Sequence, residues 1–438
     1  MQDYFYTLAD ALQARLRGAE TLLLSFDGED SDFIRFNRAR VRQAGSVVRR
    51  SLALDLIEAD RHAAGRAQLA GSLEQDLPQL QYLLEDLRGQ RARLPADPYL
   101  NFAAGGASGE TRVESKLPGR AAALEAIMGA SEGLDMVGIW ASGAICKGFA
   151  NSLGQRNWHA CESFNFDWSC HHATDKAVKA DYAGMHWDPA ELQIRMQHAR
   201  ADLEVIKRRP RTIEPGRYRV YLAPRALQEV LDMMAWGGFG LKSQRTRQSP
   251  LIRMQTEGLL LDPAVDLSEH HGRGLEPPFT SEGFAKPDRI RLVADGAYRD
   301  SLIDARSARE YDERVNAAGE WPASLDMEPG SLAAGDVLDA LDTGLYINNL
   351  WYLNFSDRNQ ARITGMTRFA CFWVEGGKMQ APVNVMRFDD SIYRMLGENL
   401  LGLTCERELL LDTGTYGGRS SHSVELPGAL VRGLTFTL

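Results

Sequence analysis

The sequence predicts an α+β protein with more than one domain, and three observations lead to this prediction. The chain has 438 residues, whereas single hydrophobic cores stop growing at roughly 250–300 residues, so two or three domains are expected. Apolar residues recur at helical spacing in segments such as 4–16 and 74–91. Runs rich in β-branched and aromatic residues, separated by Gly, Asp and Ser, lie between and after these segments and predict strands.

Composition narrows the class of protein. A hydrophobic content of 44 % and a charged content of 25 % are typical of a globular chain that buries a large core. The net charge of −9 disfavours a general nucleic-acid binder, since such proteins are usually basic. No secretory signal and no apolar stretch of about 18 residues is visible, and the five cysteines are scattered and odd in number. We therefore expect a cytoplasmic protein with reduced thiols that binds neither nucleic acid nor membranes.

The first expected domain covers residues 1–105 and consists of an antiparallel sheet flanked by helices. After the opening helix, three short runs at 21–26, 32–45 and 46–57 are predicted to pair as strands. The helix at 74–91 follows, and a Pro/Gly-rich segment ends the domain.

The second expected domain covers residues 106–212. It starts with a helical stretch at 114–130 and continues through two segments that alternate like strands. Its last helix has a well-marked beginning, with Asp188 at the N-cap, Pro189 in the first turn and Glu191 three residues after the cap.

The third expected domain covers residues 213–438 and is mostly strand and turn. A helix follows Pro224, with apolar residues on one side. The dipeptides Asp295-Gly296 and Gly376-Gly377 are each predicted to turn a hairpin, because tight hairpin turns need positive φ angles.

The order of several motifs resembles the TldD/PmbA family. They span most of residues 20–420 and read DFIRFNRARVRQAG, GFANSLGQ, FTSEGFAKPDRIRLVADGAYRDSLIDARSARE, RITGMTRFACFWVEGGKMQAPVNVMRFDDSIYRML and LLLDTGTYGGRSS. The resemblance implies a C-terminal domain built on a large, curved antiparallel sheet. It also implies a two-part peptidase system, in which a TldD protein carries zinc, pairs with a TldE (PmbA) protein and cleaves unfolded or extended peptides inside a closed channel.

The resemblance further implies that this chain is closer to the zinc-free TldE half. The TldD motif is His-Glu-x-x-x-His on the first helix of the C-terminal domain, with a Cys near the chain end. Here the matching positions are Gln228, Glu229, Met233 and Tyr416. Zinc needs three N or S ligands and an open position for water, so only Glu229, the base, keeps its residue type. We expect no catalytic residues, and zinc only in a TldD-like partner.

Other clusters admit a metal site, although a structural role is the simpler interpretation. The densest lies in RNWHACESFNFDWSCHH, which on one extended strand would be a structural segment with Phe164, Phe166 and Trp168 on its apolar face. The weak metal candidates in the whole chain are His159, Cys161, Cys170, His171, His172, His270 and His271.

A basic segment is a candidate for binding peptide. Arg38, Arg40 and Arg42 alternate along one expected strand and could hold peptide carboxylates or phosphates, although a solvated face explains them as well.

Three functions are consistent with these patterns. The favoured one is a pseudoenzyme subunit that completes the chamber of a TldD-like zinc peptidase and contacts extended peptide. The second is a self-sufficient hydrolase that uses Glu229 with a metal held by His270 and His271. The third is a homodimeric peptide-binding or scaffold protein that has lost proteolysis.

Overall fold

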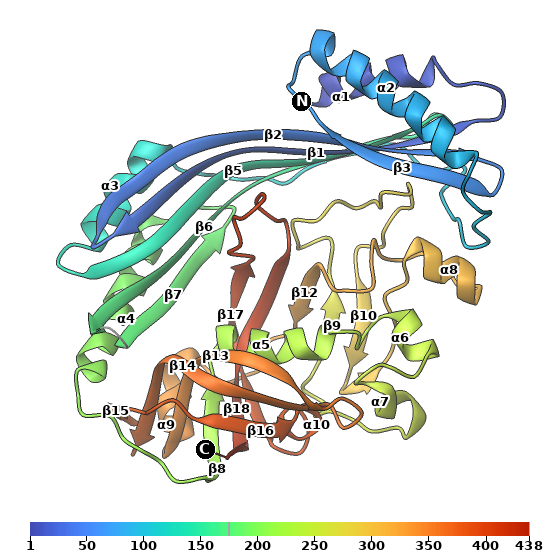
Figure 1. Cartoon of the computed structure of the whole chain (residues 1–438). Coiled ribbons are helices and arrows are strands. Elements are labelled where there is room, and N and C mark those ends of the chain that lie inside the picture. The colour runs from blue at the N-terminus through green and yellow to red at the C-terminus, as the bar shows by residue number, and fades with distance from the viewer. Residues whose placement is uncertain (174–175, 438) are drawn as a thin grey trace.

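The computed structural model describes residues 1–173 and 176–437 and has two lobes, each built around a large sheet (Figure 1). Long strands of the first half of the chain form the upper lobe, and the second half forms the lower lobe. The predicted α+β class is confirmed. None of the helices in these residues is long and apolar enough to cross a membrane.

The upper lobe contains a seven-stranded sheet, called here the N-terminal sheet. Its strands, in spatial order, are β3 (Arg61–Gln68), β2 (Arg40–Glu58), β1 (Thr21–Asn37), β5 (Asp135–Asn151), β6 (Arg156–Ala173) and β4 (Gly109–Arg112), with β7 (Lys176–Gly184) also paired to β6. All pairs are antiparallel except β4 with β6. Strands from both sides of residue 105 share this sheet, so the first two expected domains are built on one common sheet.

The strand prediction for residues 21–57 was wrong in detail. Three short runs were expected, but the chain forms one long hairpin of β1 and β2. Its turn is Arg38-Ala39, inside the second predicted run, and both residues have positive φ angles of 53° and 51°. Because neither is Gly or Asn, the usual sequence marker of such a turn is missing.

Helices cover one face of the N-terminal sheet. The helices α1 (Gln2–Gln13) and α2 (Leu73–Arg91) pack on Leu22, Leu24 and Phe26. The helices α3 (Arg120–Ala130) and α4 (Pro189–Ile206) pack in a cluster with Ile34 and Phe36, which lie farther along the same face of β1. The opposite face, with the odd-numbered residues of β1, curves over the lower lobe (Figure 1).

The lower lobe contains an eleven-stranded mixed sheet in the part of the chain that the structure describes. Its strands are β8 (Gly216–Leu222), β9 (Leu267–Glu269), β10 (Ile290–Ala294), β11 (Ala297–Tyr298), β12 (Ser324–Met327), β13 (Gly344–Asp357), β14 (Arg362–Glu375), β15 (Lys378–Pro382), β16 (Arg387–Ser391), β17 (Leu400–Leu411) and β18 (Ser423–Phe436). The sheet is antiparallel except for the pairs β12–β18 and β8–β13. It curves so far that β8 pairs with both β13 and β18, which closes a ring with β14 and β16.

Short helices and tight turns complete the lower lobe. The helix α5 (Pro224–Ala235) packs against β13 and β18, and the shorter helices are α6 (Leu241–Arg245), α7 (Ile252–Thr256), α8 (Ala305–Tyr311), α9 (Val337–Leu341) and α10 (Ile392–Met395). Both predicted hairpin turns are confirmed, because Asp295-Gly296 joins β10 to β11 and Gly376-Gly377 joins β14 to β15, all with positive φ.

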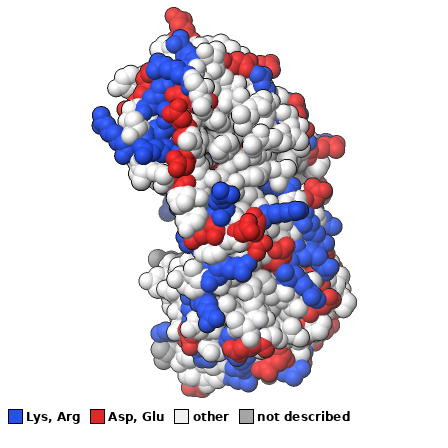
Figure 2. All heavy atoms as spheres, turned by 90° about the vertical axis from the view of Figure 1, so that its right-hand side faces the viewer, with Lys and Arg blue, Asp and Glu red and all other residues white. Residues whose placement is uncertain are grey.

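Charges are mixed over much of the surface. The face shown in Figure 2 carries basic and acidic side chains beside one another on both lobes. No large field of one sign covers this face, so selectivity for a charged ligand on this face must come from local sites.

Candidate functional site

The candidate site lies above α5, the first helix of the lower lobe. The helix begins directly after β8 with Pro224, whose fixed φ suits a first turn. Its apolar residues at helical spacing, including Leu227, Val230 and Leu231, are fully buried in the main core. The opposite side of the helix is polar and faces a cavity lined by residues of the lower lobe.

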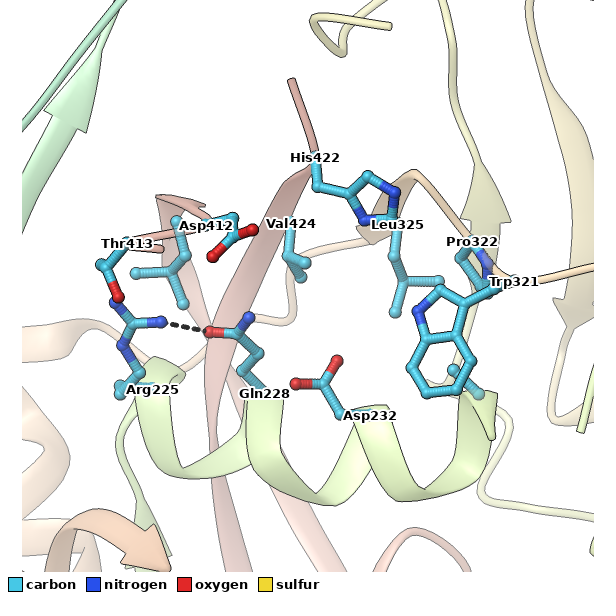
Figure 3. Close-up of a pocket in the computed structure, with 12 residues that line it drawn as sticks. Arg225, Gln228, Asp232, Trp321, Pro322, Leu325, Asp412, Thr413, His422 and Val424 are labelled. Atoms are coloured by element: carbon cyan, nitrogen blue, oxygen red, sulfur yellow. Dashed lines mark hydrogen bonds between the residues drawn. The ribbon is translucent and has the colours of Figure 1, made fainter. Parts of the chain in front are cut away.

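The cavity, called here the α5 cavity, has a volume of about 290 Å³. Arg225, Gln228 and Asp232 of α5 form its floor (Figure 3). Residues from the end of β17, the beginning of β18 and the segment before β12 form the walls, namely Trp321, Pro322, Leu325, Leu410, Asp412, Thr413, His422 and Val424. Segments far apart in the sequence therefore meet above one helix.

Arg225 is held in place by two partners. Its guanidinium lies 2.9 Å from Asp181 Oδ2 of β7 and donates to Gln228 Oε1 at 2.7 Å (Figure 3). The ion pair connects the lower lobe to the N-terminal sheet, and the hydrogen bond engages the amide oxygen of Gln228. The cavity therefore has a fixed cation on one side of its floor.

Two carboxyl groups of α5 are perturbed by this environment. Burial, together with the neighbouring carboxylates Glu229 and Asp412, raises the pKa of Asp232 to about 7, while Arg225 opposes the shift. Burial also raises the pKa of Glu229, against the opposing charges of Arg225 and Lys179. Near neutral pH, the Asp232 carboxyl therefore exchanges between neutral and charged forms, as acid and base groups in functional sites commonly do.

The family follows from a comparison with family models. Residues 215–438, half of the chain, match the model described as PmbA/TldA metallopeptidase C-terminal domain. The chain belongs to the TldD/PmbA family. A comparison with curated proteins gives no match.

Solved structures of low sequence identity share the fold over the whole chain. TldE from Thermococcus kodakarensis is 11 % identical with a TM-score of 0.79, and the match covers 100 % of each chain. A proposed modulator of DNA gyrase from Bacteroides thetaiotaomicron is 14 % identical with a TM-score of 0.76, covering 99 % of this chain and 98 % of that one. One from Thermotoga maritima is 16 % identical with a TM-score of 0.74 and 99 % coverage of both chains. At such identities the likeness concerns the fold alone.

The residues at the TldD/PmbA zinc-motif positions do not fit a zinc ion. Gln228 lines the α5 cavity, but its oxygen accepts from Arg225, and amides are poor zinc ligands. Met233 is buried in the main core, and Tyr416 is fully exposed in the segment between β17 and β18. Glu229, the residue after Gln228 on α5, is half-buried. In residues 1–173 and 176–437, no group of three His, Cys, Asp or Glu side chains is placed to hold a metal.

The cluster around β6 is spread along one unbroken strand. Phe164, Phe166 and Trp168 are buried on one face, with Cys170 in the same core, whereas Cys161 lies in a separate core. His159 is held by Thr111 Oγ1 at 2.8 Å and by the Leu275 carbonyl at 2.9 Å. His171 is half-buried and His172 exposed near the strand end.

The adjacent histidines after β9 contact the protein's own polar groups. His271 is buried with its ring nitrogens 2.8 Å from the Pro287 carbonyl and 3.1 Å from Glu269 Oε1. His270 Nδ1 lies 3.9 Å from Asp326 Oδ2, and burial lowers its pKa. Glu269 also accepts from backbone N–H groups at the beginning of β12, so this cluster stabilises the sheet.

The three candidate arginines do not alternate along one strand as predicted. Arg38 lies in the turn between β1 and β2, whereas Arg40 and Arg42 lie on β2. Arg42 is the extra residue of a bulge, since Gln43 pairs with Arg35 and Val41 with Phe36. All three arginines are exposed.

Sequence reasoning missed the residues that define the α5 cavity. Asp232 lies four positions after Gln228 and therefore on the same side of the helix, a spacing visible in the sequence. Asp412 and His422 are brought together by the pairing of β17 with β18, which places the ends of the intervening segment side by side. No local motif marks that pairing.

Proposed function

We propose that this chain is a non-catalytic, TldE-like cytoplasmic subunit of a two-part metallopeptidase system. It would complete the substrate chamber for a zinc-bearing TldD-like partner that acts on unfolded or extended peptides. The observation that carries the proposal is the state of the zinc-motif positions, where Gln228, Met233 and Tyr416 replace all three ligands at two separate places in the chain.

Loss of the ligands removes the role of the remaining motif glutamate. In a zinc peptidase the metal lowers the pKa of a bound water, and the glutamate takes its proton. Glu229 is still present, but the side chains around it do not supply a metal-bound water. The α5 cavity nevertheless stays hollow and polar, which supports a binding role for this region.

An exposed aromatic surface supports pairing with another subunit. On β13 and β14, Trp351 and Tyr352 are exposed, Tyr352 by 77 %, and Phe369 is partly exposed. Arg368 lies over the rings of Trp351 and Phe369, at 4.2 and 5.0 Å from their centroids. Large exposed apolar groups are typical of interaction surfaces. A zinc-bearing relative or a second copy of this chain would bury them, in an interface expected to exceed about 2,000 Å².

The test combines metal analysis with reconstitution. We expect the purified chain to contain zinc well below one equivalent and to hydrolyse neither casein nor peptides alone. Mixed with a relative that carries His-Glu-x-x-x-His, it should form a complex by light scattering and support peptide hydrolysis. The matched control replaces the motif glutamate of that relative by glutamine, which should abolish hydrolysis but leave the complex intact. Stoichiometric metal with chelator-sensitive activity in the isolated chain would contradict the proposal.

A further inference from the structure

Half of β2 forms a free sheet edge. β2 pairs with β1 along its whole length, but β3 pairs only with Ser51–Glu58. Between Arg40 and Arg49, no further backbone partner is found among the described residues. Figure 1 shows β2 as the outermost strand at this end of the sheet. In an edge strand, alternate residues leave both N–H and C=O groups unpaired, so this stretch can accept another strand.

The free edge is strongly basic. Six arginines and no acidic residue occur in residues 35–50, namely Arg35, Arg38, Arg40, Arg42, Arg49 and Arg50. None of them takes part in an ion pair within the part of the chain that the structure describes. By contrast, Arg66 and Arg88 of the same lobe are each paired with acidic side chains. The chain as a whole has a net charge of −9, so this cluster of arginines differs in sign from the rest of the molecule.

A groove runs beside this edge on the face of the N-terminal sheet that is turned toward the lower lobe. This edge groove has a volume of about 380 Å³. It is lined by alternate residues of β1 and β2, by Ile139 and by the loop between β17 and β18, namely Glu29, Phe33, Arg35, Gln43, Gly45, Val47, Arg49, Ile139, Thr415 and Gly418. A Cβ atom built on Gly45 would meet nothing within 4 Å, so the groove is open there.

The groove also contains a buried acceptor without a donor. Glu29 is 6 % exposed and lines the groove, and its Oε1 has no hydrogen-bond partner among the residues that the structure describes. Buried polar atoms are nearly always paired, because an unmade hydrogen bond costs about 1–3 kcal/mol. An amide or hydroxyl of a ligand in the groove would supply the missing donor.

We propose that the edge groove binds an extended, acidic peptide by strand addition to residues 40–49 of β2. The peptide backbone pairs with the free edge, its acidic side chains meet Arg35, Arg40 and Arg49, and apolar contacts come from Phe33 and Val47. The proposal takes an extended peptide as ligand from the proposed function and adds a place and a charge preference.

The groove fits a peptide better than a nucleic acid. A free strand edge supplies backbone donors and acceptors in the spacing of another strand. Binding of single-stranded nucleic acid relies on aromatic side chains for base stacking, and Phe33 is the one aromatic residue among those that line the groove.

Peptide binding to the full-length chain tests the proposal. The probe is a fluorescein-labelled peptide of alternating Glu and Thr, matched in length to residues 40–49, and affinity is measured by fluorescence anisotropy. We expect it to bind at least about tenfold more tightly than the corresponding Lys/Thr peptide and to weaken as salt is added. Two Glu/Thr peptides with N-methyl groups on complementary sets of alternate residues test strand addition. Only the peptide whose N-methyl groups replace the N–H groups that face β2 should fail to bind.

Charge-reversal variants test where on the protein the peptide binds. Arg35→Glu/Arg40→Glu should weaken the Glu/Thr peptide at least about tenfold. The matched control, Arg93→Glu/Arg309→Glu, changes the same net charge at two exposed arginines without ion pairs and should leave affinity unchanged. Equal effects of both variants, equal binding of both N-methylated peptides, or displacement of the probe by a single-stranded oligonucleotide would each overturn the proposal. So would failure of the unmodified Glu/Thr peptide to bind, which would leave the arginines as protection of the edge against aggregation.

These measurements use no partner, so they separate the two proposals. Peptide binding without any effect on a zinc-bearing relative would remove the proposed function and keep this inference. Activation of the relative without peptide binding at β2 would do the opposite.

Discussion

The α5 cavity and the edge groove are lined by different residues of one loop and differ in the balance of their charges. The loop between β17 and β18 rises from the lower lobe to the underside of the N-terminal sheet (Figure 1). Asp412, His422 and Asp232 belong to the cavity, whereas Thr415 and Gly418 of the same loop line the groove beside Arg35 and Arg49. The cavity therefore has two carboxyl groups and one guanidinium, that of Arg225, whereas the groove has two guanidinium groups and one carboxyl, that of Glu29.

The α5 cavity is polar although the residues at the positions of the TldD/PmbA zinc motif do not fit a zinc ion. The two α5 residues at the zinc-motif positions have different surroundings. Gln228 lines the cavity, whereas Met233 is buried in the core. Buried carboxyl groups destabilise a fold when they are ionised without partners, yet Asp232 lies on the cavity floor. A polar hollow kept at this energetic cost is better explained by ligand binding than by packing alone.

The largest expected effect comes from removing the apolar support of the α5 cavity. Leu231 is fully buried on the core side of α5, so Leu231→Ala should lower the free energy of unfolding by about 2–5 kcal/mol. Glu229→Gln should change it by no more than about 0.5 kcal/mol, because the half-buried carboxyl has no hydrogen bond to any described residue that the amide would lose. Urea denaturation of both variants at pH 7 measures the difference. Similar large losses in both would show that α5 does not separate a core side from a cavity side.

The next effect comes from releasing the loop that lines both hollows. Arg419 donates to Gly143 O, Ser31 Oγ and both oxygens of Ser163, all in the N-terminal sheet. Arg419→Ala leaves these acceptors without their charged donor and should cost about 2–4 kcal/mol. The released loop should also be cleaved faster by chymotrypsin after Tyr416, which is already fully exposed.

Limited proteolysis with mass spectrometry measures that cleavage. Arg93→Ala is the control, since Arg93 is exposed and forms no ion pair with any described residue, and it should leave the cleavage rate unchanged. An unchanged rate in Arg419→Ala would mean that other contacts hold the loop in place.

The sequence predicts locally determined elements and misses those set by long-range pairing. The beginning of α4 was predicted from Asp188 and Pro189, and the Asp188 side chain does accept from Ala190 N–H at 2.8 Å. Such caps depend on residues within one turn. The β1–β2 hairpin was misdivided, because the turn at Arg38-Ala39 is imposed by pairing over the whole length of two strands.

The candidate site shows the same division. The helix that carries it could be predicted from the sequence, because its apolar spacing depends on residues close together in the chain. Asp181 and Asp412, which act on Arg225 and Asp232, come from β7 and the end of β17 and are brought there by the fold. Their role could not be inferred from spacing.

The smallest predicted effect concerns the charge of the α5 cavity and depends on pH. Because the pKa of Asp232 is raised from its ordinary value of 3.8 to about 7, the folded state keeps a proton that the unfolded chain releases between these values. The contribution of Asp232 to stability therefore falls as pH rises from about 4 to about 7 and is constant above that.

Replacing Asp232 by Asn removes this pH-dependent penalty. Asp232→Asn should stabilise the protein by about 1–2 kcal/mol at pH 8, less than the full shift implies because the side chain keeps some contact with solvent. At pH 4 the same substitution should have little effect, since the carboxyl is then neutral in the folded state and only partly ionised in the unfolded chain. Asp60→Asn, at an exposed turn, should change stability by no more than about 0.5 kcal/mol at either pH. Thermal unfolding of the three proteins at both pH values provides the measurement. A gain for Asp232→Asn that is equal at pH 4 and pH 8 would show that the carboxyl is not held near neutrality, and the contrast with the basic edge groove would then rest on the arginines alone.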